Sequence, residues 1–371
     1  YQPPREDPFT GQIPDEPGAA PYRNWNERIL ETCYRPNADL GNYGRISFNV
    51  GPTLTSWMVE NSKEVLGRIV DEDRRNLTKH GVGNALAQPY NHTILPLSSR
   101  RDKETQVVWG IEAFKNLYGR TPQGMWLPET AVDLETLDVL AEQGIQFTIL
   151  APWQVECARD GEGSPYRVDL ENGRSIIVFT YDGELSSRVS FDGCATANAD
   201  AFAEYFVVPA VRKHPADSLT MIATDGELYG HHQVFRDKFL AHLVNGSTSG
   251  RGVNVTFPAL WLRENPVKRT ARIKEKSSWS CHHGIERWRG QCGCCSGSEW
   301  KKSLRSALDL LAESIDEQFE KSLRVYNVDP WKMRNQYIDV ILRKRTISEW
   351  LRFSGMQAES PNNLQKMESL F

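Results

Sequence analysis

The sequence lacks several features that would place it in common classes of protein. None of its apolar runs approaches the ~20 residues that a helix needs to span a bilayer. Its 44 basic and 48 acidic residues leave a net charge of -4, which gives no electrostatic case for a nucleic acid or an anionic membrane as a partner. Neither a Gly-x-Gly-x-x-Gly motif after an early strand nor a Gly-rich phosphate loop ending in Lys-Ser/Thr is present, which argues against a nucleotide-binding fold.

The N-terminal residues and the cysteines bear on processing and location. Residues 1–5 show neither the basic nor the apolar region of a signal peptide, and an initiator Met is missing, so we expect a processed chain or a fragment. The seven cysteines are an odd number, and four of them crowd into residues 281–295. A secreted disulfide scaffold spaces and pairs its cysteines, so we expect a cytoplasmic protein.

Apolar segments with strand and helix patterns alternate from about residue 45 to residue 257. This alternation is typical of parallel strands joined by helical crossovers, in a barrel or in an open doubly wound sheet. The missing nucleotide motifs favour the barrel, and a length of 371 residues suits a barrel of about 250 residues plus an extra element. Strands are expected at residues 45–50, 84–95, 123–127, 146–150, 174–181, 219–223 and 253–257, and helices at 57–73, 103–118, 132–143, 200–213 and 232–245.

The pattern changes near residue 298. Apolar residues recur there at helical spacing until Pro330 interrupts the run, and residues 331–353 form a second helical pattern. We therefore predict an α/β protein with a catalytic barrel and long loops at residues 1–297 and a helical subdomain at residues 298–371. The apolar stripe is expected to pack in a core, and its members are Leu304, Leu308, Leu311, Ile315, Phe319 and Leu323.

Two carboxylates follow separate predicted strands. Reactive residues of a parallel barrel collect at the carboxyl ends of its strands, where the sequence places Glu129 and Asp225. A glycosidase needs one ionised carboxylate to attack the anomeric carbon and one protonated carboxyl to assist the leaving oxygen. Taken singly, either acid is better explained as a helix cap or an Asp-Gly turn. The joint pattern, with neighbouring Trp and His residues, favours a catalytic pair.

These segments resemble glycoside hydrolase family 57, the α-amylase and α-mannosidase-like group of (β/α)7 barrels. Residues 124–129, Gly-Met-Trp-Leu-Pro-Glu, resemble the nucleophile motif, and residues 222–230, Ile-Ala-Thr-Asp-Gly-Glu-Leu-Tyr-Gly, resemble the acid/base motif. Residues 88–96 resemble the second motif region of the family. An uncharacterised branch is the most similar in residues 25–28, 47–53 and 278–294.

The start of the chain departs from the family pattern. Residues 1–5 resemble the end of the His-x-His-Gln-Pro motif that opens the barrel, with Tyr1 in place of the second His. The strand that should precede this motif is absent, so we expect a truncated chain or a natural variant.

The resemblance implies retaining chemistry by double displacement on α-linked glucans, by a hydrolase or a glycanotransferase that needs no cofactor. Glu129 would be the nucleophile and Asp225 the acid/base. An oligo- or polysaccharide is the expected partner, and the oligomeric state stays open. His92 would bind a sugar hydroxyl, and the further candidates for substrate binding are Trp57, Trp126, Trp153, Asn49, Glu227, Trp279 and Trp288.

A dense group of soft metal ligands occupies residues 281–295. It contains Cys281, Cys292, Cys294 and Cys295, with His282 and His283 between them. Zinc takes about four such ligands, but their spacing is not that of a standard zinc-binding motif. A structural zinc site, a disulfide and a plain loop near the substrate cleft all remain open.

Two other functions compete with the glycosidase. In a metal-dependent polysaccharide deacetylase, Asp225, His92 and either His231 or His232 would bind zinc. The two histidines are adjacent in sequence, so both do not easily point at one ion. A catalytically inactive glycan-binding barrel is the second alternative: loss of the first strand would favour it, and the presence of both carboxylates counts against it.

Overall fold

The computed structural model describes residue 7 and residues 9–156, 165–215, 218–294 and 296–356. The predicted motif at residues 1–5 and Cys295 lie outside these residues. None of the described helices combines the length and apolar character that crossing a membrane requires. The helices are α1 (Trp25–Ile29), α2 (Arg35–Asp39), α3 (Pro52–Asn61), α4 (Lys63–His80), α5 (Arg100–Tyr118), α6 (Leu134–Glu142), α7 (Gly183–Phe191), α8 (Ala199–Phe202), α9 (Val208–Arg212), α10 (Arg236–His242), α11 (Pro258–Glu264), α12 (Glu286–Arg289), α13 (Trp300–Arg324), α14 (Pro330–Gln336), α15 (Ile338–Ile341) and α16 (Ile347–Phe353).

The described strands form a small mixed sheet and a two-stranded pair. In the four-stranded sheet the order is β1-β4-β3-β5: β1 runs parallel to β4, whereas β3 is antiparallel to β4. The strand β2 pairs with β6. The α/β class is thus confirmed, while the antiparallel β3 departs from the all-parallel pattern expected. The strands are β1 (Phe147–Leu150), β2 (Val155–Glu156), β3 (Tyr166–Asp169), β4 (Ser175–Thr180), β5 (Arg269–Thr270) and β6 (Arg272–Ile273).

Several predicted strands are present only as single contacts between extended segments. Phe48 forms a parallel bridge with Ala85, Ala87 one with Met125, and Gly124 one with Phe147 of β1. Further along the chain, the backbone of Asp182 donates to Met221 O over 2.8 Å. The predicted strands at residues 45–50, 84–95, 123–127, 219–223 and 253–257 are therefore wrong as regular strands. The order of the first three segments is nevertheless kept, because parallel bridges join each of them to the next and the third to β1.

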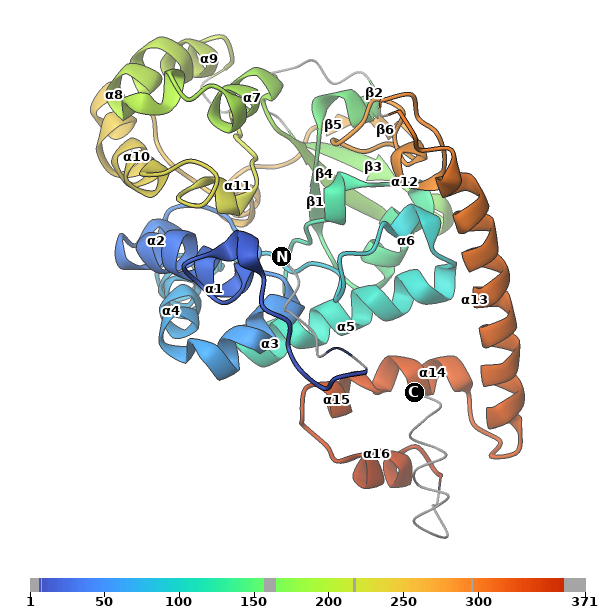
Figure 1. Ribbon diagram of the computed structural model, residues 1–371. Coiled ribbons are helices and arrows are strands. Elements are labelled where there is room, and N and C mark those ends of the chain that lie inside the picture. Colours follow the sequence, from blue (N-terminus) through green and yellow to red (C-terminus); the bar gives the residue numbers. More distant parts are fainter. Residues whose placement is uncertain (1–6, 8, 157–164, 216–217, 295, 357–371) are drawn as a thin grey trace.

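Helices α5 and α6 begin and end where local sequence signals place them. Ser99 caps α5 by accepting from the backbone N–H of Asp102, and the left-handed Gly119 ends this helix. Asp133 caps α6 through the backbone N–H of Thr136. The helix α6 packs against both α5 and β4, so one face of the sheet is covered (Figure 1).

The C-terminal helices pack on α5. The indole N–H of Trp109 on α5 donates to the carbonyls of Arg334 and Asn335, and Arg334 pairs with Asp102 over 2.8 Å. Leu323, Met333 and Trp350, with their neighbours, form a separate small hydrophobic cluster. Figure 1 shows α13 extending along one edge of the molecule, and α14–α16 below α5.

The predicted packing of the apolar stripe is correct only at its end. Leu323 is fully buried, and Phe319 packs on the same cluster. By contrast, Leu304, Leu308, Leu311 and Ile315 retain 47–56% of their accessible surface. The expectation was wrong for these four residues because helical periodicity predicts an apolar face but does not supply a surface to cover it. The single helical pattern at residues 331–353 is divided into α14, α15 and α16.

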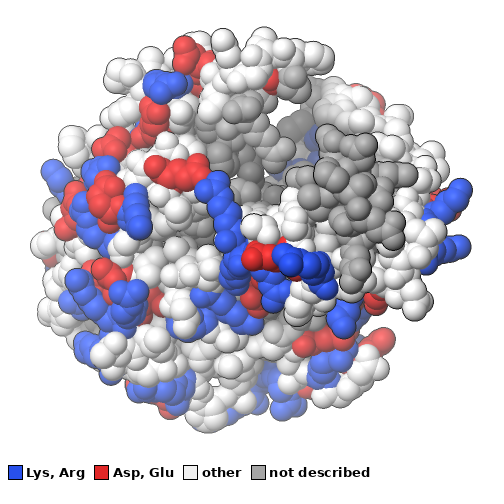
Figure 2. Space-filling model, turned by 90° about the horizontal axis from the view of Figure 1, so that it is seen from below, with Lys and Arg blue, Asp and Glu red and all other residues white. Residues whose placement is uncertain are grey.

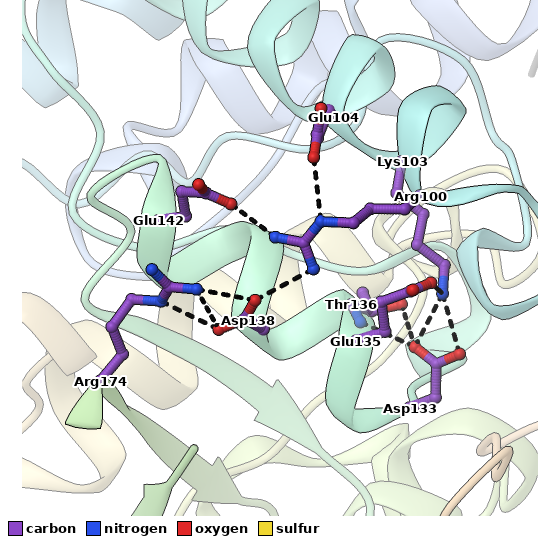
Figure 3. A network of polar contacts seen from close by, with 9 residues as sticks. All are labelled: Arg100, Lys103, Glu104, Asp133, Glu135, Thr136, Asp138, Glu142 and Arg174. Carbon is purple, nitrogen blue, oxygen red and sulfur yellow. Dashed lines mark hydrogen bonds and ion pairs between the residues drawn. The ribbon is translucent and has the colours of Figure 1, made fainter. Parts of the chain in front are cut away.

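The charged residues on the face seen in Figure 2 are of both signs. Lys and Arg side chains lie among Asp and Glu side chains across this face. Elsewhere in the chain, Arg100 pairs with Glu104, Asp138 and Glu142 (Figure 3).

Candidate active site

Glu129 lies on a strained turn after the third extended segment. Residues Pro128–Thr130 form a single 3-10 turn, and Glu129 and Thr130 have φ values of 56° and 49°. For a residue with a Cβ, such a conformation costs on the order of 1–3 kcal/mol. The conformation persists only where the surrounding structure enforces it. Two consecutive residues of this kind indicate a backbone that the fold constrains, and such strain concentrates at functional sites.

Gln154 holds this turn from within the core. It is fully buried, accepts from the hydroxyl of Thr130 over 2.8 Å and donates to the carbonyl of Thr130 over 2.8 Å. It also donates to Ser277 Oγ, and its own carbonyl accepts from the backbone of Lys274. Sequence analysis missed Gln154, because a single Gln after a Pro-Trp pair carries no recognisable signal.

The carboxylate of Glu129 accepts three side-chain hydrogen bonds. His92 Nε2 lies 3.2 Å from Oε1, and the indole N–H of Trp279 donates to Oε2 over 3.2 Å. The hydroxyl of Ser280 also donates to Oε2. The bond with His92 is the largest cause that lowers the pKa of Glu129, to about 2, against the opposing effect of burial. Glu129 is therefore ionised at neutral pH.

A buried ion pair anchors the segment that follows Glu129. Lys103 on α5 is 2% exposed, and its ammonium lies 2.9 Å from Asp133 and 2.6 Å from Glu135. Asp133 also caps α6 through Thr136, so the same carboxylate joins both helices (Figure 3). The turn at Glu129 is thus fixed on its C-terminal side as well.

Asp225 has the opposite electrostatic environment. It directly precedes the 3-10 turn Gly226–Leu228 and lines a large cavity. Although solvent in the cavity reaches this side chain, desolvation by the surrounding protein raises the pKa of Asp225, and the carboxylates of Glu227 and Glu129 raise it further. Glu129 itself is not among the residues that line the cavity.

The cavity has a volume of about 760 Å³. That size is within the range of small-molecule binding sites. The predicted residues on its wall are Asn49, His92, Trp126, Asp225 and Glu227.

Two of these polar residues have fixed positions. Glu227 accepts from the hydroxyl of Tyr34 over 2.8 Å, and Asn49 donates to Gln88 Oε1 over 2.6 Å. Tyr34 and Gln88 also line the cavity, and sequence analysis did not select either of them.

The predicted tryptophans divide into two groups. Trp126 and Trp279 meet edge to face with ring centroids 5.0 Å apart, and Trp153 lies 6.2 Å from the ring of Tyr181. Trp57 instead packs from α3 against the largest hydrophobic cluster, and Trp288 lies on α12. Of the five predicted tryptophans, Trp126 alone is among the residues that line the cavity.

Among the described residues, one group brings potential metal ligands within reach of a single ion. Its members are Cys281, His283, Cys292 and Cys294, whose ligand atoms all lie within 4.8 Å of one another. His283 was not among the zinc candidates chosen from the sequence. Within the described chain, the Asp225 and histidine set required by the deacetylase hypothesis does not form a second such group.

Comparison with known proteins places this site in a family. Residues 16–268 match the model of glycosyl hydrolase family 57, and residues 297–370 match a domain of unknown function, DUF3536. An α-amylase from Pyrococcus abyssi is 20% identical over 270 residues, which are 68% of this chain and 39% of that protein. The chain therefore spans well under half the length of this curated relative.

Solved structures share the fold at low sequence identity. A maltose-forming amylase from Pyrococcus sp. ST04 superposes with a TM-score of 0.73 at 16% identity, covering 94% of this chain and 63% of that one. For a 4-α-glucanotransferase from Thermococcus litoralis the TM-score is 0.59 at 18% identity, with coverage of 88% and 50%. Since the family model extends over more than half of the sequence, the chain belongs to glycosyl hydrolase family 57.

Proposed function

We propose that this chain is a retaining glycoside hydrolase or glycanotransferase acting on α-linked glucans. The observation that carries the proposal is the opposite displacement of two pKa values at the two carboxyl groups that stand in the family motifs. The pKa of Glu129 is lowered to about 2, and that of Asp225 is raised. A retaining enzyme needs this division, with one group charged and the other protonated.

The proposed reaction is a double displacement. Glu129 Oε attacks the anomeric carbon and forms a glycosyl ester, while Asp225 gives its proton to the departing glycosidic oxygen. Asp225, now ionised, then takes a proton from water or from a sugar hydroxyl, which attacks the ester and releases Glu129. This scheme needs no cofactor. His92, Ser280 and Trp279 hold the Glu129 carboxylate in place before attack.

The names of the relatives support the substrate class. The curated relative and the two solved neighbours are named as an α-amylase, a maltose-forming amylase and a 4-α-glucanotransferase. An α-glucan therefore fits better than other polysaccharides as the partner of the cavity. Whether water or a sugar hydroxyl is the acceptor divides hydrolase from transferase activity.

The architecture that we propose is a (β/α)7-type barrel at residues 1–297 with a helical subdomain at residues 298–371. The parallel bridges from Phe48 to β1, and the pairing of β1 with β4, support a barrel wall of short extended segments. The separate cluster around Trp350 supports a distinct C-terminal unit. The cytoplasmic location stays a prediction.

Substitution of Glu129 tests the proposal directly. We expect Glu129→Gln to lower kcat on amylose and maltooligosaccharides by at least about 10³-fold, because an amide cannot form the glycosyl ester. Glu184→Gln is a matched control, since Glu184 also follows a strand but pairs with Arg188 on α7. Reducing-sugar release and product chromatography would measure hydrolysis and transfer. Equal activity of the two variants would contradict the role of Glu129, and an unmodified chain without activity would favour the inactive glycan-binding barrel.

A further inference from the structure

Three thiols and one imidazole converge on the loop after Trp279. Cys281 Sγ lies 3.6 Å from both His283 Nδ1 and Cys294 Sγ, and Cys294 Sγ lies 3.4 Å from His283 Nδ1. Cys292 completes the group, within 4.8 Å of the other ligand atoms. The cysteines are free thiols, since a disulfide would need a sulfur–sulfur distance of about 2.05 Å.

The spacing of these atoms matches a tetrahedral zinc site. Zinc bonds of about 2.3 Å to sulfur and about 2.1 Å to nitrogen place neighbouring ligand atoms about 3.6–3.8 Å apart. Three thiolates with one imidazole are an established ligand set for closed structural zinc sites. We propose that Cys281, His283, Cys292 and Cys294 bind one structural zinc ion.

The backbone of the loop favours convergence of these ligands. Gly293 separates Cys292 from Cys294 and has a φ of 78°, in the left-handed region that glycine adopts readily. Gly284 follows His283 with a φ of 61°, and a Cβ there would lie 2.0 Å from Lys276 O. Two tight turns thus return the ligands toward one point. The two thiols nearest the core, Cys281 and Cys292, are buried.

The segment that carries the four proposed zinc ligands, residues 281–294, directly follows the residues that hydrogen-bond Glu129. Ser280 and Trp279, which bond the Glu129 carboxylate, immediately precede Cys281. Ser278 Oγ also donates to the backbone carbonyl of Glu129 over 3.0 Å. We infer that the ion fixes the C-terminal end of this segment and so positions the carboxylate. This positioning role rests on the proposed function, whereas binding of the metal does not.

Metal content of the purified full chain is the primary test. We expect one zinc ion per chain by plasma mass spectrometry after dialysis against metal-free buffer containing a reductant. His283→Asn and Cys294→Ser should lose most of the zinc. Two controls, His282→Asn and Cys194→Ser, should retain it, because neither residue belongs to the ligand group. Circular dichroism of each variant would establish that it is folded.

A second readout uses the unmodified sequence and so does not depend on variant folding. Replacement of the bound metal by Co²⁺ should give the intense visible bands of tetrahedral cobalt and a thiolate charge-transfer band in the near ultraviolet. Three results would each refute the proposed zinc site. They are a zinc-free chain as purified under reducing conditions, equal zinc content in all four variants, and a Cys281–Cys294 disulfide found by mass spectrometry.

Measurements of kcat distinguish the binding of zinc by the loop from the proposed positioning of Glu129. If the ion positions Glu129, Cys294→Ser should lower kcat on amylose by roughly tenfold or more with a small change in KM, because a displaced nucleophile loses its alignment. Loss of zinc with unchanged kcat would refute the positioning role. A zinc-loaded chain without glucan activity would count against the proposed function and leave the metal site standing.

Discussion

At the scale of single residues, burial and neighbouring charges together raise the pKa of Asp225. Desolvation is the largest cause of its raised pKa, and the next is the carboxylate of Glu227. The proposed mechanism requires protonated Asp225 and ionised Glu129. Activity should therefore be present between the low pKa of Glu129 and the raised pKa of Asp225, and should fall as the pH rises through the latter.

Glu227→Gln should move the alkaline limb of kcat/KM to lower pH. Removal of the neighbouring negative charge lowers the pKa of Asp225, so the proton needed for the leaving group is lost earlier as the pH rises. The amide still accepts from Tyr34, which preserves the local contact. Glu264→Gln, also on the cavity wall, serves as the control because Glu264 is not among the main causes of the Asp225 shift. A limb that stays in place, or moves to higher pH, would contradict this electrostatic account.

At the scale of elements, Lys103 links α5 to the start of α6. Its ammonium is buried between Asp133 and Glu135, so Lys103→Met would leave the largely buried Asp133 carboxylate without its cation. Breaking a buried pair in this way costs about 3–5 kcal/mol. We expect that loss in the free energy of unfolding measured by urea denaturation.

Lys115→Met on the same helix provides the control. Lys115 pairs with Glu112 at the surface, where both side chains keep 30–40% of their exposure. Such a pair contributes less than about 1 kcal/mol. A similar loss of stability in both variants would show that the buried network does not carry the stability assigned to it.

Sequence patterns predicted elements best where local signals agree with packing. The helix predicted at residues 103–118 lies within α5. The prediction succeeded because Gly119 is a recognisable helix C-terminal signal and because the helical pattern extends over several turns. The strands were overestimated: the apolar run at residues 45–50 forms only one bridge, through Phe48. Phe48 is also the one buried residue of this run, so the expectation of a buried strand was wrong for the rest of it, because ladder formation depends on neighbours that the local sequence does not reveal.

The same limit applies to the site. Glu129 and Asp225 could be chosen from the sequence because both stand in motifs that resemble those of the family. Their catalytic roles stay predictions. The left-handed φ of Glu129 and its support by Gln154 and Trp279 depend on contacts across 24 to 150 positions of chain, such as Thr130 with Gln154 and Trp279 with Glu129. No local pattern encodes these contacts. The metal-ligand group is local, and the sequence showed the cluster without showing which of its members converge.

At the scale of the whole molecule, the structure brings together a carboxylate whose pKa is lowered, a carboxyl group whose pKa is raised and a cavity in one family 57 chain. The core of the large α/β unit supplies the strained turn, and the loop at residues 278–294 supplies two hydrogen bonds to the Glu129 carboxylate. The central claim is that these parts act as a retaining α-glucosyl-transferring site, with Glu129 as its nucleophile.

Trapping of the covalent intermediate tests that claim most directly. The chain would be incubated with 5-fluoro-α-D-glucosyl fluoride, whose ring fluorine slows turnover of the glycosyl ester, and then digested and sequenced by mass spectrometry. The account predicts one fluoroglucosyl group, attached to the peptide at Glu129, and no labelling of Glu129→Gln. Attachment at another carboxylate, or turnover of the reagent with inversion at the anomeric carbon, would contradict it.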